Sequence, residues 1–280
     1  MYELAIVGTF YDGYYDLWED FLELFSKNWP ECPYPLYIVN DSKELNFKKE
    51  YNVTVLHAGE KAEYSQRVQT ALKAINAKYY LLLLEDFFLG EKLDANVLNN
   101  IMKFVEEKQV KYYRMQIGAF TPLGKRKTVA KIKPSMEYTI TCQPSIWRGD
   151  FLRRCIGNDV FNAWVFEGVY SKASFAHSET FLNGLYVDYR NVLCIYHGVL
   201  QGQFINKTAD HFAKYGYQFN AKMPLMDKKT EMKHNIRKLM KGIVPQPVQK
   251  IIKEKMKTKS VVERYDEEIN LLIDKMKLNN

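Results

Sequence analysis

Apolar residues in the first half of the chain gather in short runs that alternate with amphipathic stretches. The run at 79–84 (YYLLLL) has no solvated face, as expected for a strand buried on both sides. Predicted strands are 3–10, 35–41, 51–59, 79–84 and 110–120, and predicted helices are 16–28, 63–77 and about 94–108. The alternation predicts an α/β fold, a mostly parallel sheet covered by helices.

The regular alternation of predicted strands and helices ends after residue 120. The basic stretch 124–135 is typical of an irregular loop, 137–156 predicts a strand that enters a helix, and 162–176 predicts a helix in which Trp164 packs inward. Residues 185–204 predict two strands, and from about 208 the pattern is helical and charged. We therefore expect an α/β domain over residues 1–207 and a helical basic extension over 208–280.

Composition narrows the class of protein. The 280 residues are 47% hydrophobic and 26% charged, enough to build a full core. The four cysteines form no CxxC pair, which argues against a zinc ribbon or a disulfide framework and fits a reducing cytoplasm. No signal peptide and no membrane-spanning stretch is visible, so a cytoplasmic location is expected.

Positive charge is concentrated near the C-terminus. Residues 228–259 hold eleven basic and two acidic residues, although the net charge of the whole chain is only +7. Isoleucines, leucine and methionines lie among these lysines, so the segment could rest on an anionic membrane surface or pack on the body with a solvated lysine face. The segment lacks a known nucleic-acid-recognition motif and aromatic residues on which bases could stack, so nucleic acid is not an expected partner.

Two adjacent acids, Glu85 and Asp86, follow the buried run and precede Phe87-Phe88-Leu89. Ligands of open α/β sheets bind at the carboxyl ends of the strands. Carboxylates there can hold Mg²⁺ or Mn²⁺ together with the phosphates of a nucleotide. The alternative is a strand-end turn with solvated acids, but the apolar residues that follow favour the site.

The stretch YYLLLLEDFFL, with its β-α-β-β-α lead-in, resembles nucleotide-sugar-dependent glycosyltransferases of the GT-A fold, closest to a group from bacterial capsule and surface-polysaccharide clusters. The resemblance covers about residues 3–205 and includes CQPSIWRGDFL (142–152) and WVFEGVYS (164–171). The family's acidic motif is commonly DxD and binds the metal that bridges the sugar nucleotide's diphosphate. Here it is Glu85-Asp86-Phe87, which implies coordination by Asp86 assisted by Glu85.

The resemblance also implies roles for residues at other strand ends. Thr9 and Phe10, at the end of the first strand, should contact the base, and Asp41 should bond the base or the ribose, unless it only forms an Asx turn. His197 occupies the place of a third metal ligand found in some members, although a lone histidine is more often structural.

Two further candidates come from their own surroundings. Arg67 lies in the first turn of a predicted helix, where its guanidinium can bond a phosphate or a carboxylate; otherwise it is a surface arginine. Glu167 lies among aromatic residues, which raise a carboxyl pKa and suit a general base that takes the acceptor's proton. The alternative is an exposed helical glutamate.

We therefore expect a hexosyltransferase-type glycosyltransferase that uses a nucleotide-sugar donor and a divalent cation, Mn²⁺ or Mg²⁺. Its acceptor would be a hydroxyl of a glycan, lipid-linked at the inner face of the membrane, in surface polysaccharide synthesis. One alternative is a sugar nucleotidyltransferase, although the early Gly-rich loop that would favour it is absent. Another is a non-catalytic nucleotide-sugar or membrane-surface binding module. Dinucleotide-binding and P-loop motifs are absent.

Overall fold

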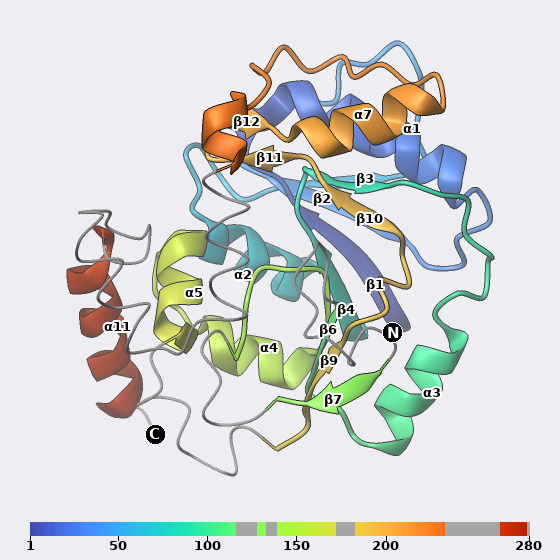
Figure 1. Ribbon diagram of the computed structural model, residues 1–280. Coiled ribbons are helices and arrows are strands. Elements are labelled where there is room, and N and C mark those ends of the chain that lie inside the picture. The colour runs from blue at the N-terminus through green and yellow to red at the C-terminus, as the bar shows by residue number, and fades with distance from the viewer. Residues whose placement is uncertain (116–127, 133–138, 172–182, 233–263, 279–280) are drawn as a thin grey trace.

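The computed structural model describes residues 1–115, 128–132, 139–171, 183–232 and 264–278. An 8-stranded sheet in the order β3-β2-β1-β4-β8-β6-β9-β7 forms its centre (Figure 1). The strands are β1 (Tyr2–Thr9), β2 (Leu36–Asn40), β3 (Thr54–His57), β4 (Ala77–Leu83), β6 (Tyr112–Met115), β7 (Val129–Lys131), β8 (Ser145–Arg148) and β9 (Leu185–Asp188).

The sheet is mostly parallel, as the sequence predicts. Strands β3, β2, β1 and β4 pair in parallel, and so do β6 and β9. Strand β8 lies antiparallel between β4 and β6, and β7 is antiparallel to β9. The carboxyl ends of β1 to β4, β6 and β9 therefore lie at one edge, together with the residues that precede β8.

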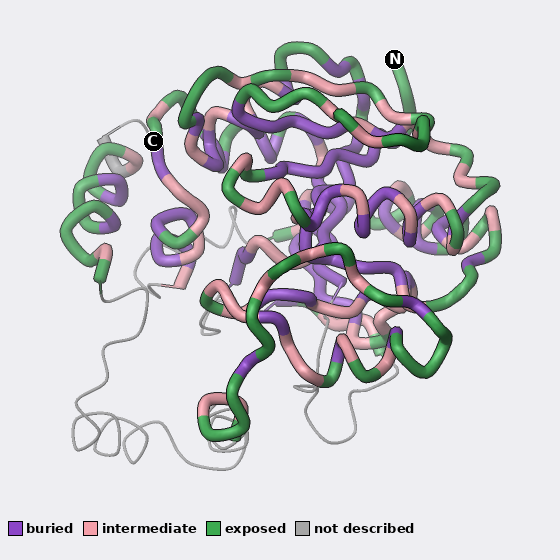
Figure 2. Tube along the Cα trace, turned by 90° about the horizontal axis from the view of Figure 1, so that it is seen from above, coloured by how far each residue is buried: buried purple, intermediate pink, exposed green. Residues whose placement is uncertain are grey.

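Helices cover both faces of this sheet. They are α1 (Trp18–Asn28), preceded by the short helix η1 (Asp12–Leu17), α2 (Tyr64–Ala74), α3 (Asn99–Glu107), α4 (Gly149–Ile156), α5 (Ala163–Ser171), α7 (Asn206–Lys214) and α11 (Asp266–Leu278). Helices α1, α3 and α7 contribute to one hydrophobic core, and α2, α4, α5 and α11 contribute to the other. Buried segments concentrate at the sheet between these layers (Figure 2).

Alternate side chains of the central strands enter opposite cores. In β4, Tyr79 and Leu81 belong to one core and Tyr80 and Leu82 to the other, and all four are buried. The same alternation holds for β1. A strand covered on both sides has no polar face, so the doubly buried strand predicted from the apolar run is confirmed over residues 79–83, and the half-buried Leu84 follows it.

A second, smaller layer lies beyond the end of β4. Strand β5 (Phe87–Leu89) pairs antiparallel with β10 (Ile195–His197), and β11 (Val199–Leu200) pairs with β12 (Gln203–Phe204). Helix α7 follows and packs Phe212 against Phe88. This layer holds the segment around His197 beside the acidic pair.

Some expectations about local structure are wrong. Residues 129–131 of the predicted irregular loop form β7, because they pair with β9 at the edge of the sheet. The predicted helix 63–77 ends at Ala74, and Ala77 already begins β4. The side chain of Trp164 does not pack inward, since it is 40% exposed.

The C-terminal region is described in part. Helix α11 packs on the body through Ile269, Leu272 and Ile273, and Lys275 Nζ lies 2.8 Å from Asp159 Oδ1. Most of the basic stretch, residues 233–259, lies outside the described residues. Within the described chain, no helix has the length and apolar character needed to cross a bilayer.

Candidate active site

The acidic pair lies in the turn between β4 and β5. Both residues are buried, with Glu85 5% and Asp86 7% exposed. Burial, and secondarily the charge of Asp86, raises the pKa of Glu85 to about 8, while Arg67 and a main-chain bond from Tyr11 act against this shift. Burying two adjacent carboxylates is costly unless a cation or a hydrogen-bond donor meets them.

Asp86 contacts the segment that follows β10. Its Oδ2 lies 2.9 Å from Nε2 of His197 and accepts a hydrogen bond of 3.2 Å from the main-chain N–H of Val199. The register that pairs His197 with Phe87 creates this contact, and the Gly198 N–H donates to the Asp86 carbonyl oxygen at 2.7 Å. A Cβ on Gly198 would lie 2.3 Å from the Phe88 ring, so the close approach requires glycine.

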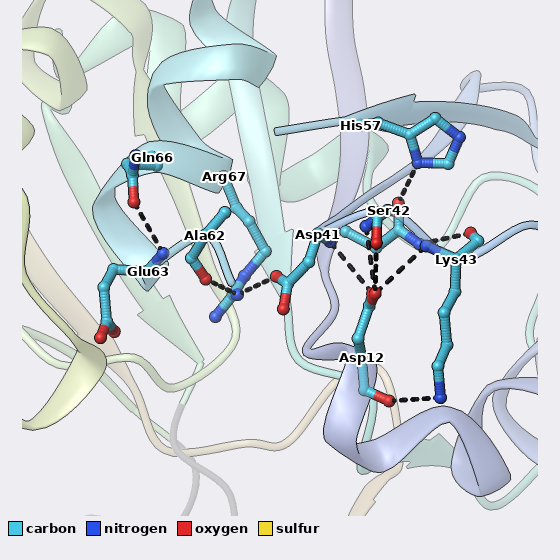
Figure 3. Close-up of polar contacts among 10 residues, drawn as sticks. Asp12, Asp41, Ser42, Lys43, His57, Ala62, Glu63, Gln66 and Arg67 are labelled. Atoms are coloured by element: carbon cyan, nitrogen blue, oxygen red, sulfur yellow. Dashed lines mark hydrogen bonds and ion pairs between the residues drawn. The ribbon is translucent and has the colours of Figure 1, made fainter. Parts of the chain in front are cut away.

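The end of β2 forms a second polar cluster (Figure 3). Asp41 is 2% exposed, and its Oδ1 accepts a 2.6 Å bond from Nη1 of Arg67, which also donates to the Ala62 carbonyl oxygen. Burial raises the pKa of Asp41 even though Arg67 lowers it. The Nε–H of Arg67 is buried without a hydrogen-bond partner among the described residues.

Asp12 fixes the loop that carries Asp41 (Figure 3). Its carboxylate accepts the main-chain N–H groups of Asp41, Ser42 and Lys43, each at 3.1 Å. Asp12 was not among the residues predicted from the sequence. The Asp12-Gly13 pair signals a turn, but it gives no sign that the carboxylate reaches a loop 30 residues away.

Helix α2 presents Arg67 at the same edge. A capping box between Glu63 and Gln66 starts the helix, which places Arg67 in its first turn. The guanidinium carbon lies 5.8 Å from the centroid of the Tyr11 ring, and the Arg67 charge acts on Glu85. Arg67 is therefore a buried residue rather than a surface arginine.

Thr9 and Phe10 differ in what they can offer a ligand. Thr9 is 2% exposed, and its hydroxyl donates to the Leu83 carbonyl oxygen at 3.4 Å. The ring of Phe10 is fully buried and packs on Trp18 and Phe21, with centroid distances of 5.5 and 4.9 Å. The Phe10 ring thus packs in the core, so the predicted base contact, which stays a prediction, would have to come from the main chain of Phe10.

Glu167 reaches the same edge from α5. Its Oε1 accepts a 2.8 Å bond from the N–H of Cys142, three residues before β8. Burial raises the pKa of Glu167, and the Cys142 N–H, Arg114 and His197 act against the shift. Glu167 is thus a half-buried carboxylate and not a fully exposed helical residue.

The structure therefore brings the predicted site residues together around the end of β4. Asp41 and Arg67 lie on the side of β1 and β2, and Glu167 lies on the side of β8. Asp86 and His197 lie between them, since His197 both contacts Asp86 and acts on Glu167. Three further residues near these groups were not predicted, because none lies in a motif and their partners are distant in the chain: Tyr11, Asp12 and Arg114.

The predicted metal ligands form a pair rather than a cluster. In the described part of the chain, no group of three histidine, cysteine, aspartate or glutamate side chains is placed to hold a metal ion. The Asp86 oxygen and the His197 nitrogen are adjacent donors of the types that Mn²⁺ accepts. Such ions can be bound by one or two protein ligands, with substrate phosphates and water supplying the rest, so the pair fits a cation that arrives with a diphosphate.

Solved structures with a similar fold include enzymes. Staphylococcus aureus TarS (residues 1–349) is 15% identical with a TM-score of 0.45, and the alignment covers 67% of this chain but only 57% of that one. A mannosyltransferase, PcManGT from Pyrobaculum calidifontis in complex with GDP-Man and Mn²⁺, is 13% identical with a TM-score of 0.45, over 79% and 66% of the chains.

A cytidylyltransferase from Leptospira borgpetersenii is 11% identical with a TM-score of 0.38, over 61% of this chain and 69% of that one. No protein-family model and no curated protein matches the sequence. Because all these scores are low, the assignment of the site rests on its own geometry.

Proposed function

We propose that the protein is a glycosyltransferase that moves a sugar from a nucleotide-sugar donor to a hydroxyl of a glycan. One observation supports the proposal: three groups of polar side chains lie at one edge of the sheet. They are the Asp41–Arg67 pair, the Glu85-Asp86 pair with His197, and Glu167. These groups match the parts of the reaction: a base and ribose, a diphosphate, and a hydroxyl that loses its proton.

Asp41 and Arg67 hold the nucleoside part of the donor. Asp41 is an acceptor for a base or ribose N–H or O–H, and the unpaired Nε–H of Arg67 can donate to an oxygen of the donor. Donor binding would satisfy a buried polar group that otherwise costs about 1–3 kcal/mol. The Thr9 hydroxyl lies at the neighbouring strand end.

Asp86 and His197 are the residues that would hold a divalent cation, with Glu85 assisting from the adjacent position. When bound, such a cation neutralises the negative charge that develops on the departing diphosphate. Asp86 also fixes the β10–β11 segment through the N–H groups of Gly198 and Val199.

Glu167 is the proposed general base. In an inverting transfer, the acceptor oxygen attacks the anomeric carbon, the bond from that carbon to the phosphate oxygen breaks, and its electron pair leaves with the nucleoside diphosphate. Glu167 takes the acceptor's proton. Its raised pKa makes it a better base than an ordinary glutamate, and the Cys142 N–H fixes one of its oxygens.

The location and the acceptor are part of the proposal. We place the protein in the cytoplasm, at the inner face of the membrane, with a lipid-linked glycan as acceptor in surface polysaccharide synthesis. The catalytic domain would span residues 1–207, and the basic extension 208–280 would contact anionic lipid. The charge of residues 228–259 supports this.

A donor-cleavage assay tests the function. The protein is incubated with Mn²⁺ and a panel of UDP-, GDP- and CDP-sugars, and release of nucleoside diphosphate is measured. Asp86→Asn should lower release by about 100-fold or more, while its melting temperature stays near that of the parent. A nucleotidyltransferase would instead release pyrophosphate from a nucleoside triphosphate and a sugar phosphate. A binding module would be stabilised by a donor and would release nothing.

A further inference from the structure

Trp164 differs from the other tryptophans of the chain. The chain has four, and Trp18, Trp29 and Trp147 are at most 2% exposed, whereas Trp164 is 40% exposed. An indole contributes to folding mainly when it is buried. The exposure of Trp164 is therefore not explained by the stability of α5.

The exposed face of α5 is narrow and holds Trp164 together with Glu167. The residues Val165, Phe166, Gly168, Val169 and Tyr170 are buried, and those that remain are Ala163, Trp164, Glu167 and Ser171. At about 100° per residue, these four fall within one arc of about 100°. Residues three apart on a helix are neighbours, with Cβ atoms about 5–6 Å apart, so Trp164 adjoins Glu167.

This face adjoins the edge of the sheet that carries the proposed site. Glu167 bonds the N–H of Cys142 just before β8, and β8 lies on the opposite side of β4 from β1 and β2. The Asn162 side chain caps α5 by accepting the Val165 N–H at 2.9 Å, which fixes the turn that carries Trp164. The indole thus lies beside the proposed base, on the β8 side of the site and not on the side of Asp41.

We propose that Trp164 is the stacking platform for the terminal pyranose ring of the acceptor glycan. This inference rests on the proposed function. One face of a pyranose carries C–H groups that pack on the negative face of an indole, while the hydroxyls around the ring edge stay free for hydrogen bonds. A ring stacked on Trp164 presents an edge hydroxyl toward Glu167, one helical turn away.

Fluorescence quenching tests the platform directly. Because the other three indoles are buried, iodide quenches mainly Trp164 in the folded protein. The probes are methyl glycosides of glucose, galactose, mannose and N-acetylglucosamine, together with their β-linked disaccharides. We expect at least one of them to protect Trp164 from iodide, and UDP or GDP alone to leave quenching unchanged. The platform proposal is overturned if a nucleotide alone protects Trp164, or if none of the sugars protects it.

Kinetics with substituted proteins provide the second test. With the best protecting sugar as acceptor, Trp164→Ala should raise the acceptor KM about tenfold, and Trp164→Phe should raise it less because a ring remains. Donor cleavage with water as acceptor should be unchanged in both. Val160→Ala is the matched control, because Val160 is 61% exposed in the loop before α5.

These tests distinguish a failure of the proposed function from a failure of the Trp164 platform. If the unsubstituted protein cleaves no donor, the proposed function itself is wrong. If it cleaves donor and Trp164→Ala leaves the acceptor KM at the parental value, the function stands and the platform is overturned. A fall in donor cleavage that accompanies the change in KM would also overturn it, since the indole would then act on the donor.

Discussion

His197 Nε2 lies 2.9 Å from Asp86 Oδ2, and this contact joins two segments that are more than a hundred residues apart. Strand pairing produces it, because β10 places His197 opposite Phe87, the neighbour of Asp86. The Thr208 hydroxyl also donates to the His197 carbonyl oxygen at 2.6 Å, which anchors the segment on α7. The acidic turn and His197 therefore form one structural unit, and substitutions can test Asp86 and His197 separately.

Asp86→Asn should lower kcat/KM by about 100-fold or more, equivalent to about 2.7 kcal/mol of transition-state stabilisation. The amide oxygen can still accept the Val199 N–H, so the fold should persist. His197→Ala should raise the Mn²⁺ concentration for half-maximal binding about 10- to 100-fold. Calorimetric Mn²⁺ titration in the presence of UDP measures this without a catalytic readout.

His211→Ala is the control for His197→Ala. His211 stacks on Tyr196, with ring centroids 3.9 Å apart, and its Nε2 faces the Gly90 carbonyl oxygen rather than Asp86. This variant should keep the parental Mn²⁺ affinity. Equal losses in the two histidine variants would mean that His197 acts only on stability.

Arg67→Met should destabilise the protein by about 3–5 kcal/mol, because it leaves the buried carboxylate of Asp41 without its partner. Asp41→Asn combined with Arg67→Met should cost less than Arg67→Met alone, since no buried charge remains unpaired. Urea unfolding of the parent, both single variants and the double variant gives the coupling free energy. Additive effects would show that the ion pair contributes nothing of its own.

Vesicle binding tests the basic segment. The protein should sediment with vesicles containing phosphatidylglycerol and not with pure phosphatidylcholine, and salt should release it. Lys250, Lys253 and Lys255 changed together to Gln should weaken binding by about 1 kcal/mol per lysine. Lys48 and Lys49, exposed on the body, changed to Gln provide the control. Equal binding to neutral vesicles would contradict the electrostatic contact.

Local pattern predicted most of the elements and brought forward the candidate residues that the structure places near one another. The apolar run before Glu85 indicated a doubly buried strand, and the Trp164–Glu167 stretch indicated a helix, because both signals lie within one element. The insertion of β8 between β4 and β6 could not be predicted, since strand order depends on pairing between distant segments. The same limit applies to Asp12, whose partners follow another strand, and to Phe10, whose ring α1 covers.

Asp188 should make the fold sensitive to acid. It is fully buried at the end of β9, bonded by Arg190 Nε at 2.8 Å and by the Tyr113 hydroxyl at 2.6 Å. Burial alone would raise the pKa of Asp188, but the bonds from Arg190 and Tyr113 outweigh it and hold the pKa below its ordinary value.

A folded-state pKa below the unfolded one stabilises the fold above the unfolded value, about 3.9, and this stabilisation is lost as the pH falls through the folded value. Asp188→Asn should lower the free energy of unfolding by about 2–3 kcal/mol at pH 7. The difference from the parent should shrink as the pH falls below about 4. Urea unfolding across that range measures it, and a difference independent of pH would contradict the assignment.

Glu167 should set the acidic limb of the pH–rate profile. A general base must be deprotonated, so kcat/KM should fall as the pH drops through the pKa of Glu167, which burial raises above its ordinary value of about 4.3. The Cys142 N–H, Arg114 and His197 limit the rise, and Tyr64 also faces this carboxylate.

Glu167→Gln keeps the bond to the Cys142 N–H but cannot accept the acceptor's proton. Transfer should fall about 100- to 10,000-fold, the acidic limb should disappear from the residual rate, and nucleotide binding should be unchanged. Glu106→Gln, which breaks the ion pair with Lys78 and touches none of the proposed site residues, is the matched control and should keep the parental profile. Because protonating a buried structural acid could also lower the rate, melting temperatures are measured across the same pH range. An acidic limb that survives in Glu167→Gln assigns the proton transfer to another group.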